Sequence, residues 1–554
     1  MSYMPPIPDL TLALTVAGAD ALRAPFDNFD SETTEAILDA AGGLAAGALA
    51  PLNRVGDEIG ARFENGKVIP VPGFADAYQA FAGGGWNGLS ASPEFGGQGL
   101  PKALEVCVYE MMQSANMSFA LCPMLTQGAI EALTAHGTAR QKKVYLPRLV
   151  SGQWTGTMNL TEPQAGSDLG LLRTRAEPDG DGGYRLFGQK IFITWGDHDL
   201  TDNIVHLVLA RLPDAPAGTK GISLFLAPKR LVNDDGSLAA ANALKPASIE
   251  HKLGIHASPT CVMLYEGAKA ELIGAPHQGL ALMFTMMNAA RLHVGVQGVG
   301  IAERAYQQAL SFARERRQGR SILTGENPAP IIDHPDVRRT LMLMKAKIEA
   351  ARMICLSTAV AADRAHAGDS DAKLREEFLT PIAKAWSTDV GVEVASLALQ
   401  LHGGMGYVEE TGAAQHYRDA RIAPIYEGTN AIQAIDLVGR KLGLESGGAA
   451  FALLDEISAA AATQGNAALS AAADSARATT YWLIEKKGTA DALAGATPYL
   501  ELMGDVVGGW LLAKAAVLDS GRAPHARLFA SQVLSKASGL ALAVMAGASD
   551  LALA

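Results

Sequence analysis

In the segment from Arg418 to Asn430, Glu427 is the carboxylate whose position suits a general base. Glu427 is well separated from Asp419, and apolar residues precede it. Gly428 and Thr429 follow, and they are typical of a turn that starts a helix. A carboxylate at such a junction can project into a cavity, where desolvation raises its pKa and makes it a stronger base. The alternative is a surface glutamate before a helix N-terminus, where the helix dipole favours negative charge.

A second segment that could do chemistry is Leu160–Asp168, which follows a predicted strand. Pro163 and Gly166 make it a rigid, sharply turned loop. The hydroxyls of Thr161 and Ser167, together with backbone amides, could bind a polar ring edge or a phosphate. The same residues also suit an ordinary connection after a strand.

Aromatic, amide and guanidinium groups recur further along the chain. The segment 192–196 places Phe192 and Thr194 near a strand end, where packing in a core is the simpler interpretation. Asn288 and Arg291 are three residues apart on a predicted helix and therefore share a face. A lone arginine on such a helix is usually a surface or ion-pair residue.

Two more segments could contact a phosphorylated cofactor. A basic cluster lies near the C-terminal end of the same helix, and consists of Arg314, Arg316, Arg317 and Arg320. The helix dipole itself favours cations there, and a pyrophosphate clamp is the functional alternative. Gln400–Tyr407 is a glycine-rich loop whose backbone either approaches a cofactor closely or only ends a helix. His402 within this loop is more often a structural residue than an acid–base group.

The predicted helices and strands that must position these groups indicate a mostly α protein with a β domain. The chain of 554 residues is too long for one hydrophobic core. We expect an N-terminal helical domain over residues 1–150, a β domain over 151–275, a four-helix bundle over 276–445 and a helical extension over 446–554.

Hydrophobic periodicity predicts the individual elements. Residues 1–30 are rich in proline and predict irregular structure, and helices follow over 31–50, 74–82, 102–116 and 124–137. Short runs of β-branched and aromatic residues predict an antiparallel sandwich or barrel, with strands over 154–160, 184–187, 190–194, 203–210, 222–227, 249–253 and 260–265. Helical periodicity returns over 279–316, 335–367, 372–401 and 431–442, and the Ala-rich extension predicts helices over 449–464, 467–487, 491–519 and 526–553.

Composition excludes several classes of function. A net charge of −11 without a long basic run argues against a nucleic-acid-binding surface. The four cysteines contain no CxxC and suggest neither a disulfide framework nor a metal site, so we expect a reducing, cytoplasmic location. The N-terminus lacks the basic segment of a secretory signal, and the longest apolar run, residues 537–548, is too short to span a bilayer. No phosphate-loop or dinucleotide fingerprint occurs in its required context.

In combination and order, the motifs resemble those of the acyl-CoA dehydrogenase family over about residues 35–445. The resemblance rests on LTEPQAGSD at 160–168, GQKIFIT at 188–194, HKLGIHASPT at 251–260, QLHGGMGY at 400–407 and RDARIAPIYEGTNAIQ at 418–433. Met158 and Gln164 depart from the pattern, because the family more often has Tyr and Gly there. The long Ala-rich tail is similar to that of a larger subgroup, which includes enzymes acting on 3-methylthiopropanoyl-CoA.

The resemblance implies non-covalent FAD, held between the β domain and the helical bundle, with a neighbouring subunit completing the site. It implies FAD contacts for Met158, Leu160, Thr161, Gly166, Ser167, Phe192, Thr194 and Thr429. It implies contacts to the FAD of the neighbouring subunit for Arg316, Gln400, Gly403 and Gly404. Contacts to the acyl-CoA substrate are implied for Ser167, Asn288, Arg291 and Gly428.

The activity implied is FAD-dependent dehydrogenation of an acyl-CoA to the trans-2-enoyl-CoA. Glu427 would remove the α-proton while flavin N5 accepts the β-hydrogen as hydride. The substrate would be 3-methylthiopropanoyl-CoA, an intermediate of dimethylsulfoniopropionate catabolism, or a short or medium fatty acyl-CoA of β-oxidation. The resemblance further implies electron-transferring flavoprotein as acceptor and a homodimer, or else a tetramer. Two alternatives are an acyl-CoA oxidase that uses oxygen and a non-catalytic scaffold with a flavin fold, and the intact Glu427 argues against the scaffold.

Overall fold

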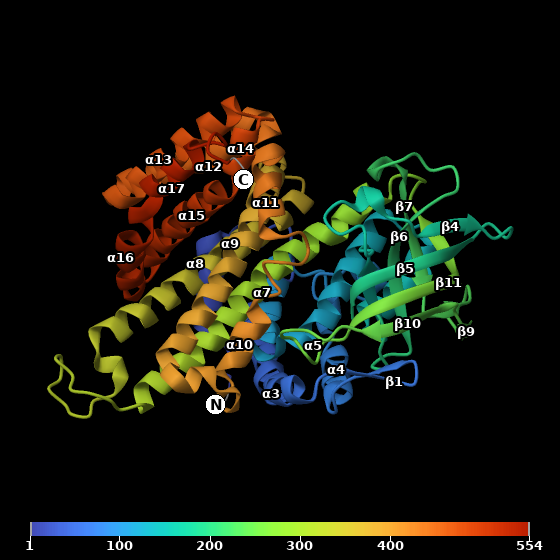
Figure 1. Cartoon of the computed structure of the whole chain (residues 1–554), viewed down its shortest axis with the longest axis horizontal. Coiled ribbons are helices and arrows are strands. Elements are labelled where there is room, and N and C mark those ends of the chain that lie inside the picture. The colour runs from blue at the N-terminus through green and yellow to red at the C-terminus, as the bar shows by residue number, and fades with distance from the viewer. Residues whose placement is uncertain (1–2, 552–554) are drawn as a thin grey trace. The chain divides into compact units, whose positions relative to one another are not determined.

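The computed structural model describes residues 3–551, and the chain divides into two compact units. The helical unit comprises Met1–Gly42, Pro101–Ser114 and Arg291–Ala554. The strand unit comprises Gly43–Leu100 and Ala115–Ala290 and contains every strand of the described residues (Figure 1). The predicted class, mostly α with a β domain, is confirmed.

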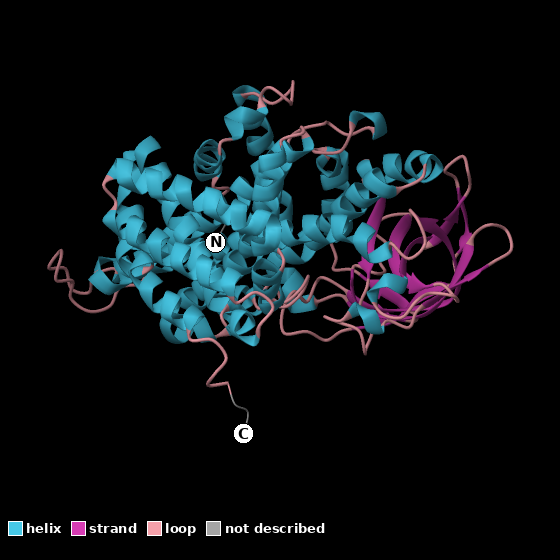
Figure 2. Cartoon of the chain, turned by 90° about the horizontal axis from the view of Figure 1, so that it is seen from above, coloured by secondary structure: helices cyan, strands magenta, loops and turns pink. Residues whose placement is uncertain are grey.

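The strand unit is built around a seven-stranded sheet, whose strands gather together in Figure 2. Its order is β10-β11-β5-β4-β6-β3, with β7 pairing both β11 and β6. These strands are β3 (Trp154–Asn159), β4 (Arg175–Pro178), β5 (Tyr184–Thr194), β6 (Asn203–Arg211), β7 (Ile222–Pro228), β10 (Leu244–Ile249) and β11 (Thr260–Ile273). Two short hairpins accompany the sheet, β1 (Arg62–Glu64) with β2 (Lys67–Ile69) and β8 (Arg230–Val232) with β9 (Leu238–Ala241).

The sheet is mainly antiparallel, but β3 runs parallel to β6, with Trp154 opposite Asn203. The expectation of an antiparallel sheet therefore needs this correction. Every residue of β3 is buried, and so is nearly every residue of β6. Strands buried on both faces are typical of parallel pairing, because other elements cover both sides.

Individual strand predictions differ from the structure in three ways. The two runs predicted at 184–187 and 190–194 form one strand, β5, which pairs with β11 through two register shifts. The strand predicted at 249–253 is wrong, because β10 ends at Ile249 and the following residues form a loop up to Thr260. Strands β4, β8 and β9 were missed because each has only three or four residues.

Helices of the strand unit support its sheet and loops. They are α3 (Ala50–Ile59), α4 (Phe74–Gly83), α6 (Ala139–Val150), and parts of α5 (Lys102–His136) and α7 (Gly279–Glu315). Two helices were predicted within α5, and the structure joins them at Asn116, whose φ of −159° and ψ of 91° are not helical. The Asn116 side chain accepts a hydrogen bond from the Phe119 amide, so it caps the second half of α5.

The helical unit contains the remaining helices, of which Figure 1 labels α8 to α17. The first part comprises α1 (Ile7–Ala17), α2 (Ser31–Leu44), α8 (Pro335–His366), α9 (Ser370–His402), α10 (Ala413–Ala420) and α11 (Asn430–Gly439). The extension comprises α12 (Gly448–Gln464), α13 (Ala467–Glu485), α14 (Ala490–Ala494), α15 (Ala496–Leu518), α16 (Ala523–Gln532) and α17 (Ala537–Met545). The helix predicted over 526–553 is thus divided between α16 and α17, and its last two residues lie outside the described residues.

The expectation of irregular structure before residue 31 is wrong, because α1 occupies Ile7–Ala17. Pro8 lies in the first turn of α1, where a missing amide hydrogen costs nothing. The high proline content therefore marks the start of a helix. Leu10 and Leu14 of α1 are buried, and α1 packs against α8 and α15.

The extension packs against four helices from the first part of the helical unit, namely α1, α8, α9 and α11. Trp386 of α9 is the clearest contact. Its indole nitrogen donates to Asp505 of α15 at 3.0 Å, and its ring lies 6.4 Å from that of Phe529 on α16. The extension is therefore a buried part of the helical unit.

Buried charges further tie these helices together. Arg352 of α8 is 1% exposed and donates to both carboxylate oxygens of Glu110 on α5 at 2.6–3.0 Å. It also donates to Glu303 of α7 at 2.9 Å. Three helices far apart in sequence thus meet at one guanidinium.

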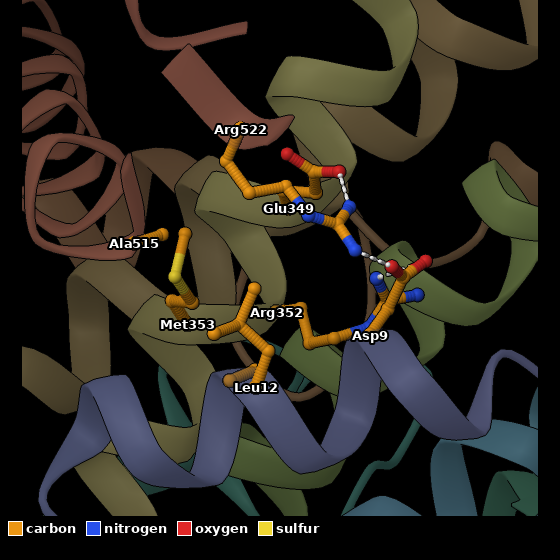
Figure 3. A pocket seen from close by; sticks show the side chains of 8 residues that line it. Asp9, Leu12, Glu349, Arg352, Met353, Ala515 and Arg522 are labelled. Carbon is orange, nitrogen blue, oxygen red and sulfur yellow. Dashed lines mark hydrogen bonds and ion pairs between the residues drawn. The ribbon is translucent and has the colours of Figure 1, made fainter. Parts of the chain in front are cut away.

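A second arginine, Arg522, joins the extension to α1 and α8. It donates to Asp9 at 2.6 Å and forms an ion pair with Glu349 at 2.5 Å, and Figure 3 shows its guanidinium between the two carboxylates. Burial alone would raise the pKa of Asp9, but Lys345, Arg352 and Arg522 hold it well below its usual range. Asp9 is therefore charged at neutral pH.

Two helical stretches, Ser31–Ile59 and Ser520–Met545, are long and apolar enough to cross a membrane by length and composition only. Each consists of several elements, and the second is interrupted by a 3₁₀ turn at Leu534–Lys536. Core helices of globular proteins pass the same test, so these stretches are weak evidence for a membrane segment.

Candidate active site

Glu427 lies in a tight turn between α10 and α11. Its φ of 55° and the φ of 81° at Gly428 place two successive residues in the left-handed region, which is rare for a glutamate. Thr429 is the N-cap of α11 and accepts a hydrogen bond from the Ile432 amide at 3.3 Å, which confirms the predicted helix start. The chain therefore turns sharply at Glu427 and Gly428 before α11 begins.

Two buried side chains hold this turn. Gln433 of α11 donates from its amide to the carbonyl oxygens of Glu427 at 3.2 Å and Gly428 at 3.3 Å. Lys384 of α9 donates to the Gly428 carbonyl at 2.9 Å. The sequence motifs predicted a role for neither residue. Lys384 could have been found as the one charged residue in the apolar run Phe378–Trp386.

The electrostatics of the site favour a base that works near neutral pH. Glu427 is half-buried, and within residues 3–551 its carboxylate makes no hydrogen bond or ion pair. Burial raises the pKa of Glu427 to about 7, although the positive charges of Arg291 and Lys384 oppose the rise. The carboxylate is therefore available to accept a proton from a bound molecule.

Arg291 of α7 lies beside the same turn. It is 5% exposed, and its Nη1 lies 3.4 Å from the Asp436 carboxylate on α11. A Cβ atom added to Gly428 would lie 3.9 Å from Arg291 Nη2, so the guanidinium closely approaches the glycine. The structure thus brings Arg291, Glu427 and Gly428 together, whereas Asn288 lies one turn earlier on α7 and is exposed.

The residues that the resemblance assigns to a neighbouring subunit's FAD lie at the adjoining ends of α7 and α9. The rings of Phe312 and His402 are 4.5 Å apart and bring these ends together. Arg316 is exposed and forms no ion pair in the described part of the chain. Gln400 is exposed as well, and a Cβ atom on Gly403 or Gly404 would meet nothing within 4 Å.

His402 itself is structural, as expected. It is 5% exposed, and its Nδ1 lies 2.7 Å from the Ala398 carbonyl within the same helix. Burial lowers the pKa of His402, so the ring is neutral at physiological pH. It packs against Phe312 at the end of α9, where the glycine loop begins.

In the strand unit, the loop after β3 is held by a buried ion pair. Lys190 of β5 is fully buried and donates to Glu162 at 2.8 Å and to the Leu160 carbonyl at 2.9 Å. Glu162 also accepts from the Arg173 and Thr174 amides at 2.6 and 3.0 Å. Burial lowers the pKa of Lys190 to about 8, and Lys190 outweighs burial to lower that of Glu162 to about 2.

This arrangement leaves the polar groups of the loop accessible. Thr161 is partly buried, whereas Gly166 and Ser167 are exposed, and Leu160 is 9% exposed. Among the residues that the structure describes, neither the Thr161 nor the Ser167 hydroxyl forms a hydrogen bond. Free hydroxyls and amides on a rigid loop suit the polar edge of a heteroaromatic ring.

Phe192 lies in β5 and is 59% exposed, with a φ of 60°. The interpretation of Phe192 as core packing is therefore wrong. The neighbouring Trp195 occupies the core instead, where it is 1% exposed and donates from its indole to the Ser118 carbonyl at 3.1 Å. Thr194 is partly buried, and Met158 of β3 is buried.

Metal chemistry finds no support in residues 3–551, where no group of three or more His, Cys, Asp and Glu side chains could hold a metal ion. The four cysteines are buried, free thiols. Burial raises the pKa of Cys355 and of Cys122, which makes both thiols poor nucleophiles.

Comparison with protein families matches most of the chain. The N-terminal domain of acyl-CoA dehydrogenase matches residues 31–153, the middle domain 157–297 and the C-terminal domain 277–442. A fourth family, described as acetyl-CoA dehydrogenase C-terminal like, matches residues 451–554. The extension is therefore a recognised domain in its own right.

Two curated relatives cover nearly the whole chain. The 3-methylmercaptopropionyl-CoA dehydrogenase of Ruegeria pomeroyi is 45% identical, over 97% of this chain and 97% of its own. A broad-specificity linear acyl-CoA dehydrogenase of Mycobacterium tuberculosis is 33% identical, over 91% of this chain and 88% of its own.

Solved structures show the same fold. Caenorhabditis elegans ACDH-11 in complex with C11-CoA has a TM-score of 0.79 and 22% identity, over 96% of this chain and 93% of its own. An acyl-CoA dehydrogenase of Bacillus anthracis complexed with FAD has a TM-score of 0.75 and 21% identity, over 94% and 88% of the two chains.

Proposed function

The chain belongs to the acyl-CoA dehydrogenase family, and from this premise we propose that it oxidises 3-methylthiopropanoyl-CoA to its trans-2-enoyl-CoA with Glu427 as the base. The observation that best supports the proposal is the environment of the Glu427 carboxylate. It is half-buried, has no partner within residues 3–551, and burial raises its pKa to about 7. A structural glutamate would ordinarily have a hydrogen-bond partner.

FAD is the cofactor of this family, and the residues of the chain fit it. When bound, it supplies the two-electron chemistry by accepting the β-hydrogen of the substrate as hydride. In the strand unit, Thr161 and Ser167 offer free hydroxyls and Phe192 an exposed ring, which suit the polar edge and the face of a flavin. In the helical unit, the exposed Arg316 suits a pyrophosphate, and Gly403 and Gly404 leave open space beside it.

The residues around the turn perform the proton transfer. The thioester carbonyl acidifies the α-hydrogen, and the Glu427 carboxylate removes it as a proton. A base whose pKa is near 7 is substantially ionised near neutral pH and yet strong enough to take this proton. Gly428 has no Cβ, so its backbone can approach the thioester closely. Arg291 keeps positive charge near the developing enolate.

The substrate assignment rests on the Ruegeria pomeroyi relative, because 3-methylmercaptopropionyl-CoA and 3-methylthiopropanoyl-CoA are the same thioester. The Mycobacterium tuberculosis relative acts, by its name, on linear acyl chains. We therefore expect the methylthio substrate to have the highest kcat/KM, with short linear acyl-CoAs as weaker substrates. This would place the enzyme in dimethylsulfoniopropionate catabolism.

We further propose a cytoplasmic homodimer that passes electrons to electron-transferring flavoprotein. Exposed apolar side chains support the dimer, since Ile322 is 83% and Tyr407 90% exposed. Ile322 follows Arg316 within a few residues, and Tyr407 follows Gly404. A neighbouring subunit that covered them would also bring its FAD to Arg316, Gln400, Gly403 and Gly404.

Steady-state kinetics with the purified protein test the proposal. The expected result is turnover of 3-methylthiopropanoyl-CoA with electron-transferring flavoprotein, at a kcat/KM above those of butanoyl-CoA and octanoyl-CoA. Equal turnover with oxygen as the sole acceptor would assign an oxidase. A colourless protein that does not take up FAD would contradict the function altogether.

A further inference from the structure

Lys384 is a buried ammonium group that the chemistry above does not use. Its side chain is 0% exposed, and its Nζ donates to the Gly428 carbonyl at 2.9 Å and to Asn430 Oδ1 at 2.8 Å. In the described part of the chain, no carboxylate lies within ion-pair distance of this Nζ. Burial disfavours the charged form of a lysine that has no direct counter-ion, so a lysine kept at this position calls for a reason beyond packing.

Asn430 extends this contact into α9. Its Nδ2 lies within hydrogen-bond distance of the Ala385 carbonyl at 3.1 Å, Thr388 Oγ1 at 3.0 Å and Asp389 Oδ1 at 2.8 Å. Lys384 and Asn430 thus connect one face of α9 to the turn that carries the base. The Gly428 carbonyl thus accepts hydrogen bonds from Lys384 of α9 and from Gln433 of α11.

Because the proposed function makes Glu427 the base, the inference that follows rests on it. We propose that Lys384 is a positioning residue for Glu427, which fixes the left-handed turn through the Gly428 carbonyl and keeps a positive charge beside the carboxylate. It acts through Glu427 and needs no contact with the substrate. Its hydrogen bonds specify where the base points, and its charge favours the ionised base.

The two groups titrate over the same range. Burial lowers the pKa of Lys384 to about 7, and the charges of Glu427 and Asp389 oppose this. Since burial also raises the pKa of Glu427 to about 7, protonation of each group depends on the state of the other. The other charged groups around this cluster are Arg291 on α7, Arg421 before the turn, Asp436 on α11, Arg440 after α11 and Glu501 on α15.

The sign of the effect follows from the charge of Lys384. An ammonium group beside a carboxylate stabilises the ionised form, so its removal raises the pKa of the base. The base then needs a higher pH to become ionised. The acid limb of the kcat profile, where kcat rises with pH, should therefore move to higher pH. A change that only loosened the turn would lower kcat and leave this limb in place.

The test compares Lys384→Met with Lys373→Met, which changes an exposed lysine on the same helix. For Lys384→Met we expect normal FAD content, a kcat lower by about 10²-fold because the base is displaced, and a KM within about twofold of wild type. We also expect the acid limb to move up by about one pH unit. Lys373→Met should behave as wild type in each measurement.

The inference would be overturned if Lys384→Met kept the wild-type kcat and its acid limb stayed at the wild-type pH. An acid limb that moved to lower pH would also overturn it. If Lys384→Met fails to fold or to bind FAD, Asn430→Ala decides the matter, because it loosens the turn and leaves the charge. That variant should lose kcat while its limb stays in place, and an unchanged kcat would overturn the inference. Turnover by Glu427→Gln would instead show that the proposed function had failed.

Discussion

At the scale of single residues, the site consists of one free carboxylate and the groups that hold its turn. The sequence identified Glu427, Gly428 and Thr429 because they form a compact motif. It did not identify Lys384 or Gln433, which reach the turn only through the packing of α9 and α11. Hydrogen bonds from side chains to backbone depend on that packing, and neither periodicity nor motif spacing encodes them.

The raised pKa of Glu427 makes a prediction for the dependence of activity on pH. A base acts in its ionised form, so kcat/KM should rise tenfold per pH unit below about pH 7 and level off above it. An unperturbed glutamate would level off about two to three units lower. Initial rates across this range, with the FAD content checked at each pH, measure the limb. A profile that is flat down to about pH 5 would contradict the assignment.

The loop after β3 shows how the elements prepare a cofactor site. Its partly buried Thr161 and its exposed Gly166 and Ser167 belong to a recognisable motif. The ion pair that supports the loop could not be read from the motifs, because Glu162 and Lys190 are 28 residues apart and meet only when β5 passes the loop. The local backbone also explains why Phe192 is exposed and not in the core, since a left-handed φ in β5 turns it outward while Trp195 fills the core.

The Glu162–Lys190 pair therefore makes a prediction about FAD binding. In Lys190→Met the buried Glu162 loses its counter-ion, and the loop should lose its fixed position. We expect the Kd for FAD to rise at least tenfold, measured by flavin fluorescence quenching on refilling the apoprotein. Lys269→Met on β11 is the control, because this lysine is exposed on the same sheet. An unchanged Kd in Lys190→Met would refute the role of the pair.

The buried ion pairs between helices of the helical unit lead to a prediction about stability. Arg352→Met would leave Glu110 and Glu303 buried without their shared cation, which typically costs about 3–5 kcal/mol. Urea unfolding followed by circular dichroism measures this loss. Arg339→Met is the matched control, since Arg339 is 44% exposed on the same helix and should change stability by about 0.5 kcal/mol or less. Similar midpoints for the two variants would contradict the argument.

At the scale of the whole molecule, the order of helical and strand segments was predictable from periodicity, and the family from its motifs. The helix α1 and the parallel pairing of β3 with β6 were not, because both depend on contacts between distant segments. The four domain boundaries of the sequence analysis stay predictions.

The extension makes a prediction of its own. A chain ended after Glu445 would expose Trp386 and the faces of α8, α9 and α11 that α15 and α16 cover. We expect this truncated chain to aggregate or to unfold at a lower Tm than the full chain. Size-exclusion chromatography and thermal unfolding would reveal it. A soluble, active fragment of wild-type Tm would show that the extension is dispensable for folding.

The central claim is that Glu427 removes the α-proton, and one measurement tests it most directly. Glu427→Gln and wild type, both loaded with FAD, are mixed anaerobically with 3-methylthiopropanoyl-CoA while the flavin absorbance is followed. Glu410→Gln is the control, because this glutamate is exposed. Wild type and control should bleach rapidly, whereas Glu427→Gln should keep its FAD and bleach at least about 10²-fold more slowly. Bleaching of Glu427→Gln at the wild-type rate would contradict the claim.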